Sequence, residues 1–134
     1  MKIEEIEGIG PVYAAKLGEA GVRTTDDLLE QGASASGREK LAVASGLSTG
    51  QVLKWVNHVD LMRLDGVGSE YADLLEAAGV DSCTELARRN PANLAQTFAE
   101  LDAARPNTVR RVPGETTVAT WVEQAKTFDK VVTH

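Results

Sequence analysis

The stretch "IEGIGPVYAAKLGEAGV" (residues 6–22) decides the fold, because the chain repeats it as "LDGVGSEYADLLEAAGV" (residues 64–80). The two copies align without gaps and share eight of seventeen residues, including both hairpin glycines and the tyrosine. At ordinary residue frequencies, chance would give about one match. The chain therefore contains an internal repeat.

A second pair of matching segments extends the repeat. "QVLKWVNHVDLM" (51–62) matches "TVATWVEQAKTF" (117–128), and Trp55 and Trp121 occupy equivalent positions. The apolar residues of both segments have the spacing of one face of a helix. Because 134 residues is an ordinary length for one domain, we assign a single domain to residues 1–134, with internal repeats at 1–63 and 64–134.

Helix start signals are frequent along the chain, whereas strand signals are absent. Capping-box patterns begin at Ser36, Ser48 and Ser82, and Asn90 precedes a proline. No run of residues alternates between apolar and polar side chains. The pattern predicts an all-α fold of about eight short helices. The predicted ranges are 11–20, 25–31, 37–45, 49–63, 69–78, 83–89, 91–104 and 116–128.

Composition and charge exclude several classes of protein. The net charge of −6 and the isoelectric point near 4.9 disfavour non-specific binding to nucleic acid or to anionic lipid. No stretch approaches the roughly 18 apolar residues of a membrane span. The single cysteine, Cys83, needs no oxidising compartment, and "MKIEEIEGIG" lacks the apolar run of a signal peptide. These features predict a cytoplasmic protein without a membrane partner.

The Gly-apolar-Gly pattern at the start of each copy has a physical meaning. The first glycine can adopt a positive φ and reverse the chain, and the second opens the following helix. We expect Ile9 and Val67, which lie between the glycines, to enter the core. The backbone N–H groups at the start of a helix, together with its dipole, form a potential anion site.

These residues also carry a resemblance to a known motif. "GIGPVYAAKL" (8–17) and "GVGSEYADLL" (66–75) resemble the helix-hairpin-helix motif of DNA-repair and recombination proteins and of the C-terminal domain of the RNA polymerase α subunit. Nearly the whole chain resembles a bacterial family catalogued only as a domain of unknown function. The resemblance implies tandem helix-hairpin-helix repeats with a pseudo-twofold arrangement. It also implies an architecture similar to SAM-like domains and to the N-terminal domain of DNA polymerase β.

In DNA-binding proteins with this motif, hairpin N–H groups contact a backbone phosphate. The resemblance implies that the contacts would come from Gly8, Ile9, Gly10, Gly66, Val67 and Gly68. This chain departs from the pattern, because Glu7 and Asp65 stand where proline is frequent and Glu70 follows the second hairpin. Carboxylates at these positions would repel a phosphate. The alternative interpretation is that both hairpins only pack the helices together.

One region is basic although the chain is acidic. Residues 86–114 contain five arginines and only two acidic residues, which gives this stretch a charge of +3. Arginines suit bidentate contacts to phosphate or to the carboxylates of a partner. A solvated loop and helix face is the alternative. The candidate basic patch consists of Arg88, Arg89, Arg105, Arg110 and Arg111.

We find no acid–base pair, nucleophile arrangement or metal cluster in the sequence, so we predict that the chain is not an enzyme and holds no metal or cofactor. The leading hypothesis is a binding and assembly module for an unknown protein partner or for self-association. The alternative is weak or structure-specific nucleic-acid binding through the second hairpin and the arginines.

Two structural expectations follow from the repeat. Trp55 and Trp121 should be buried at equivalent positions. Helix 116–128 has no hairpin after it, so we expect it to pack beside the first hairpin, near Ile9 and Tyr13, within the chain or from a partner chain. His58 is expected at the rim of its helix face.

Overall fold

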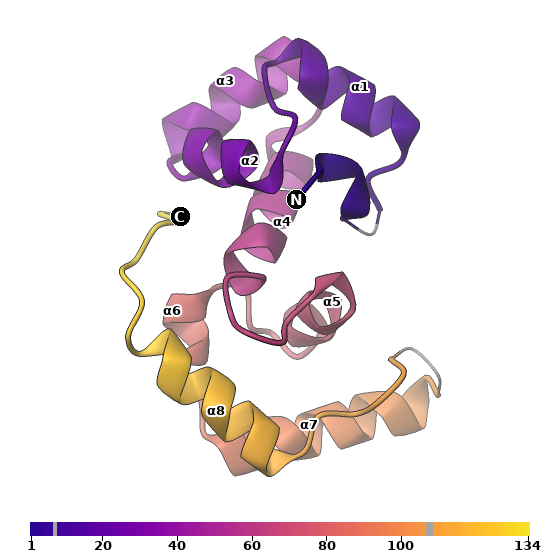
Figure 1. Cartoon of the computed structure of the whole chain (residues 1–134), viewed down its shortest axis with the longest axis vertical. Helices are drawn as coiled ribbons and strands as arrows, with labels where there is room; N and C mark the ends of the chain where they lie inside the picture. Colours follow the sequence, from indigo (N-terminus) through magenta and orange to yellow (C-terminus); the bar gives the residue numbers. More distant parts are fainter. Residues whose placement is uncertain (7, 107–108) are drawn as a thin grey trace. The chain divides into compact units, whose positions relative to one another are not determined.

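The computed structural model describes residues 1–6, 8–106 and 109–134, and this part of the chain is helical without a strand. The all-α prediction is therefore confirmed. Each predicted range contains a helix, but two helices begin earlier than predicted, one ends later and several end earlier (Figure 1). They are η1 (Ile3–Glu5), α1 (Pro11–Glu19), α2 (Thr25–Gly32), α3 (Ala35–Ser45), α4 (Thr49–Leu61), α5 (Ser69–Ala77), α6 (Cys83–Leu86), α7 (Pro91–Ala104) and α8 (Glu115–Ala125).

The residues group into two compact units. Unit 1 comprises Met1–Asp60 together with Val131–His134, and unit 2 comprises Leu61–Lys130. The change of unit after Asp60 falls close to the predicted boundary between the repeats. The assignment of the whole chain to one domain stays a prediction.

Unit 1 packs its helices around an aliphatic core whose members include Leu17, Leu28 and Val56. The end of the chain belongs to this core, because Val132 is buried in it. The backbone N–H of the following residue, Thr133, donates to the carbonyl oxygen of Ala33 at 2.8 Å. The C-terminal residues thus complete unit 1 although they follow unit 2 in the sequence.

A buried arginine stabilises the same part of unit 1. The Arg38 guanidinium donates hydrogen bonds to the carbonyl oxygens of Gly32, Ala33 and Thr133, at 3.0, 3.0 and 2.7 Å. It therefore satisfies carbonyls at the end of α2 that have no partner within the helix. Burial of a charged side chain is tolerated here because these hydrogen bonds replace water.

Unit 2 builds its core from α5 to α8, with Leu75, Leu86 and Phe98 fully buried. Helices α7 and α8 lie side by side (Figure 1). Aromatic side chains are few, so short apolar residues from all four helices fill most of the space. The core of unit 2 thus has the same aliphatic character as that of unit 1.

The helix start signals were read correctly in three of four cases. Ser48, Ser82 and Asn90 each accept a hydrogen bond from the backbone N–H three residues later, at 3.1 Å. The prediction for Ser36 is wrong, because α3 begins two residues earlier and Ser34 accepts the bond from Gly37 N–H at 3.1 Å. Two serines with the same chemistry stand close together there, and sequence alone does not separate them.

The predicted positions of the tryptophans are confirmed. Trp55 and Trp121 are only 6% and 3% exposed, and each belongs to the core of its own unit. Trp55 packs against Tyr13 and Trp121 against Tyr71, both with ring centroids 5.3 Å apart and the rings tilted.

The expectation that the last helix packs beside the first hairpin, within the chain or from a partner chain, stays a prediction, because that hairpin belongs to the other unit. Helix α8 packs on the hairpin of its own repeat, because Trp121 stacks on Tyr71 and an added Cβ at Gly66 would lie 3.9 Å from its indole nitrogen. The helix that carries Trp121 therefore packs against the hairpin that precedes it in the same repeat.

Candidate functional site

The two glycine hairpins have the same backbone geometry. We define hairpin 1 as residues 8–10 and hairpin 2 as residues 66–68. Gly8 and Gly66 adopt φ angles of +92° and +81°, a conformation that favours glycine over residues with a Cβ. Gly10 and Gly68 are the extended N-cap residues of α1 and α5. The structure therefore forms both turns as the glycine spacing predicts.

Backbone hydrogen bonds repeat around the two hairpins as well. The N–H of Ile9 donates to Ile6 O at 3.1 Å, and the N–H of Val67 donates to Leu64 O at 3.2 Å. Both middle residues are buried, as expected from their position between the glycines. These bonds and this burial fix the direction in which α1 and α5 leave the hairpins.

The N-termini of α1 and α5 are the parts of the hairpins that suit an anion. Neither Gly10 nor Gly68 has a side chain that accepts from the helix, so the first N–H groups are not capped from that position. Helix N-termini of this kind attract negative charge. Hairpin 1 has one donor fewer, because α1 begins with Pro11 whereas α5 begins with Ser69.

A carboxylate already lies beside hairpin 2. The side chain of Glu70, in the first turn of α5, accepts a hydrogen bond from the backbone N–H of Arg110. Its other oxygen lies 3.8 Å from Nε of the same arginine. Tyr71 O–H donates to Arg111 O at 2.7 Å, so the segment before α8 lies along the start of α5. The negative charge of Glu70 interacts favourably with the N-terminus of α5, as a bound phosphate would.

The remaining arginines of the predicted basic patch lie elsewhere in unit 2. Arg89 donates to the Glu85 carboxylate at 3.0 Å and to Gly79 O at 3.1 Å, near the C-terminal end of α5. Arg105 follows α7 and, with Asp102, lines a cavity of about 300 Å³. Arg88 is exposed after α6. Among the described contacts, only Arg110 and Arg111 are held at the start of α5.

A capping box that the sequence reading missed begins α2. Thr24 Oγ1 accepts from Asp27 N–H, and the Asp27 carboxylate accepts from the N–H groups of Arg23 and Thr24, all at 3.1 Å. These hydrogen bonds lower the pKa of Asp27; the bond from Arg23 N–H has the largest effect, and those with Thr24 have smaller ones. The usual capping box has Glu or Gln at the third helical position, whereas this one has the shorter Asp27.

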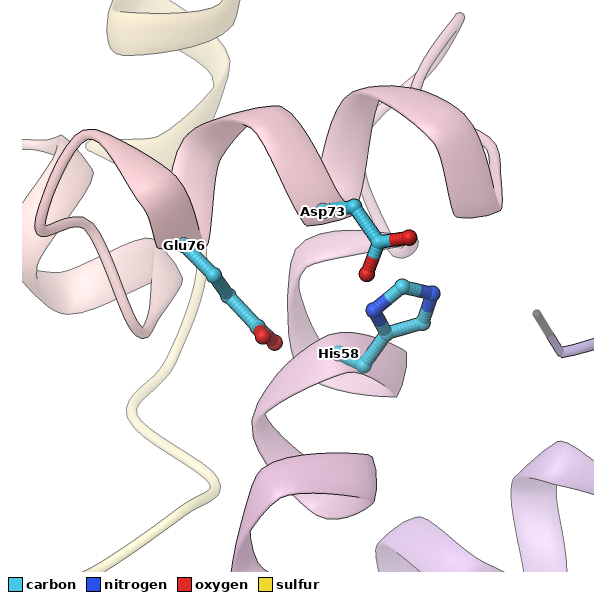
Figure 2. Close-up of side chains that lie close together, drawn as sticks. All are labelled: His58, Asp73 and Glu76. Carbon is cyan, nitrogen blue, oxygen red and sulfur yellow. The ribbon is translucent and has the colours of Figure 1, made fainter. Parts of the chain in front are cut away.

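The structure corrects the interpretation of His58. This side chain on α4 is 2% exposed and therefore buried, not at a rim. Figure 2 shows Asp73 and Glu76 extending from the same side of α5, as residues three positions apart on a helix do. His58 belongs to unit 1, and the two carboxylates belong to unit 2.

Within the described ranges, none of the helices combines the length and the apolar character that crossing a membrane would require.

The fold and the hairpins define a class: an all-α chain of two units, each with a glycine hairpin before a helix and a tryptophan helix that packs on it. The family described as "Domain of unknown function (DUF4332)" matches residues 7–128, and the chain belongs to this family. Comparisons with curated proteins and with solved structures gave no match.

Proposed function

We propose that the chain is a non-catalytic binding and assembly module of two helix-hairpin-helix units, and that it binds protein and not nucleic acid. The observation that carries the proposal is the Glu70 carboxylate at the start of α5, in contact with both the backbone and the side chain of Arg110. A phosphate that approached hairpin 2 would meet this carboxylate, which is already in contact with Arg110.

The charge of each unit supports the same proposal. Unit 1 contains six basic and nine acidic residues, and unit 2 contains eight and eleven, so each has a net charge of −3. The five arginines of the basic stretch are therefore outweighed within their own unit. Contacts with phosphates supply most of the affinity of non-specific DNA binding. Because each unit has a net negative charge, it repels the phosphate backbone, and this lowers the affinity for DNA. A cytoplasmic location stays part of this proposal.

Weak or structure-specific nucleic-acid binding is the second candidate, because one observation favours it. Arg111 is exposed and lines a cavity of about 480 Å³ together with Tyr71 and the first residues of α8. A phosphate in this cavity would lie near the Arg111 guanidinium and the N-termini of α5 and α8, but also near Glu115, which lines the same cavity. Neutralising Glu70 would then uncover a binding site.

Fluorescence anisotropy with duplex, single-stranded and branched DNA, at about 50 and 200 mM salt, separates the two candidates. We expect no binding at micromolar protein for the wild type and none for Glu70→Gln. If the second candidate holds, log K falls with log salt at a slope of about −3 to −4.5, and replacing Arg110 and Arg111 by Ala reduces that slope by up to about 2. Micromolar binding that is lost in the double variant would overturn our proposal.

A further inference from the structure

Unit 1 binds the last residues of the chain as it would bind a peptide. We define the tail segment as residues 131–134, which form no helix or strand and belong to unit 1. Val132 is buried, with 3% exposure. The carbonyl oxygen of Ala33 accepts from the Thr133 N–H at 2.8 Å and from the Thr133 hydroxyl at 3.3 Å, and Thr133 O accepts from Arg38 Nη2 at 2.7 Å. Main-chain hydrogen bonds of this kind, next to a pocket for one side chain, are typical of peptide recognition.

The guanidinium of Arg38 is a buried charge whose hydrogen-bond acceptors are all neutral. Arg38 is 5% exposed, and it donates to three carbonyl oxygens, those of Gly32, Ala33 and Thr133. Among the residues that the structure describes, none of the carboxylates forms an ion pair with it. Buried charges in proteins are usually paired with a charge of opposite sign. A carboxylate would therefore bind this guanidinium more strongly than the Thr133 carbonyl does.

Unit 1 holds the arginine in place independently of the tail segment. Nη1 donates to Gly32 O and Ala33 O, both at 3.0 Å, whereas the bond to the tail segment comes from Nη2. A Cβ added at Gly32 would collide with Val56 and lie 3.7 Å from Arg38 Cγ, so the glycine leaves room for the arginine side chain. If the tail segment detaches, Nη2 loses its acceptor while Nη1 keeps both of its own.

We propose that Ala33, Arg38 and the apolar space filled by Val132 form a recognition site for the C-terminal end of another polypeptide. We call this site the tail seat. Its ligand has an aliphatic residue next to last, in the place of Val132, and a last residue whose N–H donates to Ala33 O. The terminal carboxylate of the ligand binds Arg38. This inference rests on the proposed function as a protein-binding module and identifies one class of partner.

The position of the Thr133 carbonyl explains why the ligand is a chain end. Arg38 Nη2 meets a main-chain carbonyl oxygen, and the terminal carboxylate of a peptide that stopped at this residue would occupy the same place. The second oxygen and the negative charge are added without any change in the path of the backbone. The tail segment occupies the same seat and therefore competes with the ligand, so the tail seat binds the ligand only in molecules whose tail segment is detached.

Two variants of the full chain are designed to detach the tail segment. Val132→Asn places an amide in apolar surroundings, and Thr133→Pro removes the N–H that donates to Ala33 O. Val43→Asn is the matched control, because it makes the same change at a residue of unit 1 that is 86% exposed. Circular dichroism checks that each variant is folded.

The probe is a fluorescently labelled peptide with the sequence of residues 129–133, Asp-Lys-Val-Val-Thr, ending in a free carboxylate. The same peptide with a C-terminal amide is its control. We measure binding by fluorescence anisotropy at up to about 1 mM protein, which detects weak complexes. Both detachment variants should bind the free acid about tenfold more tightly than the amide, because the charge-assisted hydrogen bond is the stronger one. The wild type and Val43→Asn should bind the acid at least about tenfold more weakly than the detachment variants do.

A second substitution assigns the preference to the arginine. Arg38→Gln, introduced into the Val132→Asn chain, removes the charge, so the free acid and the amide should bind equally. Four results would overturn the proposal: no binding of the acid to either detachment variant, equal binding of acid and amide to them, equal binding of the acid to the wild type, or an acid preference that survives Arg38→Gln. These results leave the wider proposal of protein binding intact. Binding in the DNA experiment would overturn that wider proposal whatever the peptides do.

Discussion

The two units form the same hairpin but surround it with different polar contacts. At one pair of equivalent positions, Gln31 donates to Gly21 O at 3.3 Å in unit 1, and Arg89 donates to Gly79 O at 3.1 Å in unit 2. Both side chains thus satisfy the carbonyl of the glycine that follows the hairpin's helix. The backbone geometry depends on the glycines and the buried apolar residues, whereas the polar side chains around it vary.

A second pair of equivalent positions differs more. In unit 1, Asp27 is half of a capping box and accepts from backbone N–H groups. In unit 2, Glu85 has one methylene more and pairs with Arg89 one turn along the chain. The comparison shows that equivalent acidic residues stabilise the two units in different ways, and that similarity of sequence does not extend to charge contacts.

The largest expected effect concerns the tryptophans. Trp55→Ala and Trp121→Ala should each lower the free energy of unfolding by about 3–5 kcal/mol, because each ring is buried and its loss leaves a cavity. Urea denaturation followed by circular dichroism measures the loss, and the remaining tryptophan reports on the other unit by fluorescence. Trp→Phe variants, which keep most of the volume, are the controls. A loss of less than about 1 kcal/mol would contradict the core assignment.

The second-largest expected effect concerns the glycines with positive φ in the two hairpins. Gly8→Ala and Gly66→Ala should each cost about 1–2 kcal/mol, because alanine is strained at positive φ. An added Cβ meets nothing within 4 Å at Gly8 and only an ordinary contact at Gly66, so the two costs should be equal. Gly10→Ala is the matched control, since Gly10 has a φ of −85° and open space around it. If this control costs as much as Gly8→Ala, the positive φ is not the cause.

The smallest effect depends on pH. The folded state lowers the pKa of Asp27, so its ionised form stabilises unit 1 above the ordinary pKa, and this contribution is lost as the pH falls through the folded pKa. Asp27→Asn should therefore lower the free energy of unfolding more at pH 7 than near pH 2. Urea denaturation at both pH values measures the difference. An effect that is equal at the two pH values would show that ionisation of Asp27 is not involved.

Much of the fold could be predicted because short-range signals decide it. The helix starts at Ser48 and Asn90 depend on hydrogen bonds to residues three positions away. The turn at Gly8 depends on the ability of glycine to adopt a positive φ. The partner of Trp121 could not be predicted, because spacing along a helix gives the buried face but not the element that covers it.

The candidate site was less predictable, because its polar contacts join residues that are far apart in the sequence. The glycine spacing indicated both hairpins, but it could not show that Glu70 binds Arg110 across forty residues of sequence. Likewise, the charge count of residues 86–114 suggested a patch, whereas the contacts of Arg89 and Arg110 separate them along α5. Long-range pairing of charged side chains depends on the tertiary structure.

Double-mutant cycles on the tyrosine–tryptophan pairs test most directly that each repeat closes on its own hairpin. The cycles use Tyr13→Leu with Trp55→Leu and Tyr71→Leu with Trp121→Leu, and the free energy of unfolding is measured for every variant. Because both pairs have the same centroid distance and nearly the same tilt, we predict equal coupling energies of about 0.5–1.5 kcal/mol. A coupling near zero for Tyr71 and Trp121, with a normal coupling for Tyr13 and Trp55, would contradict the account.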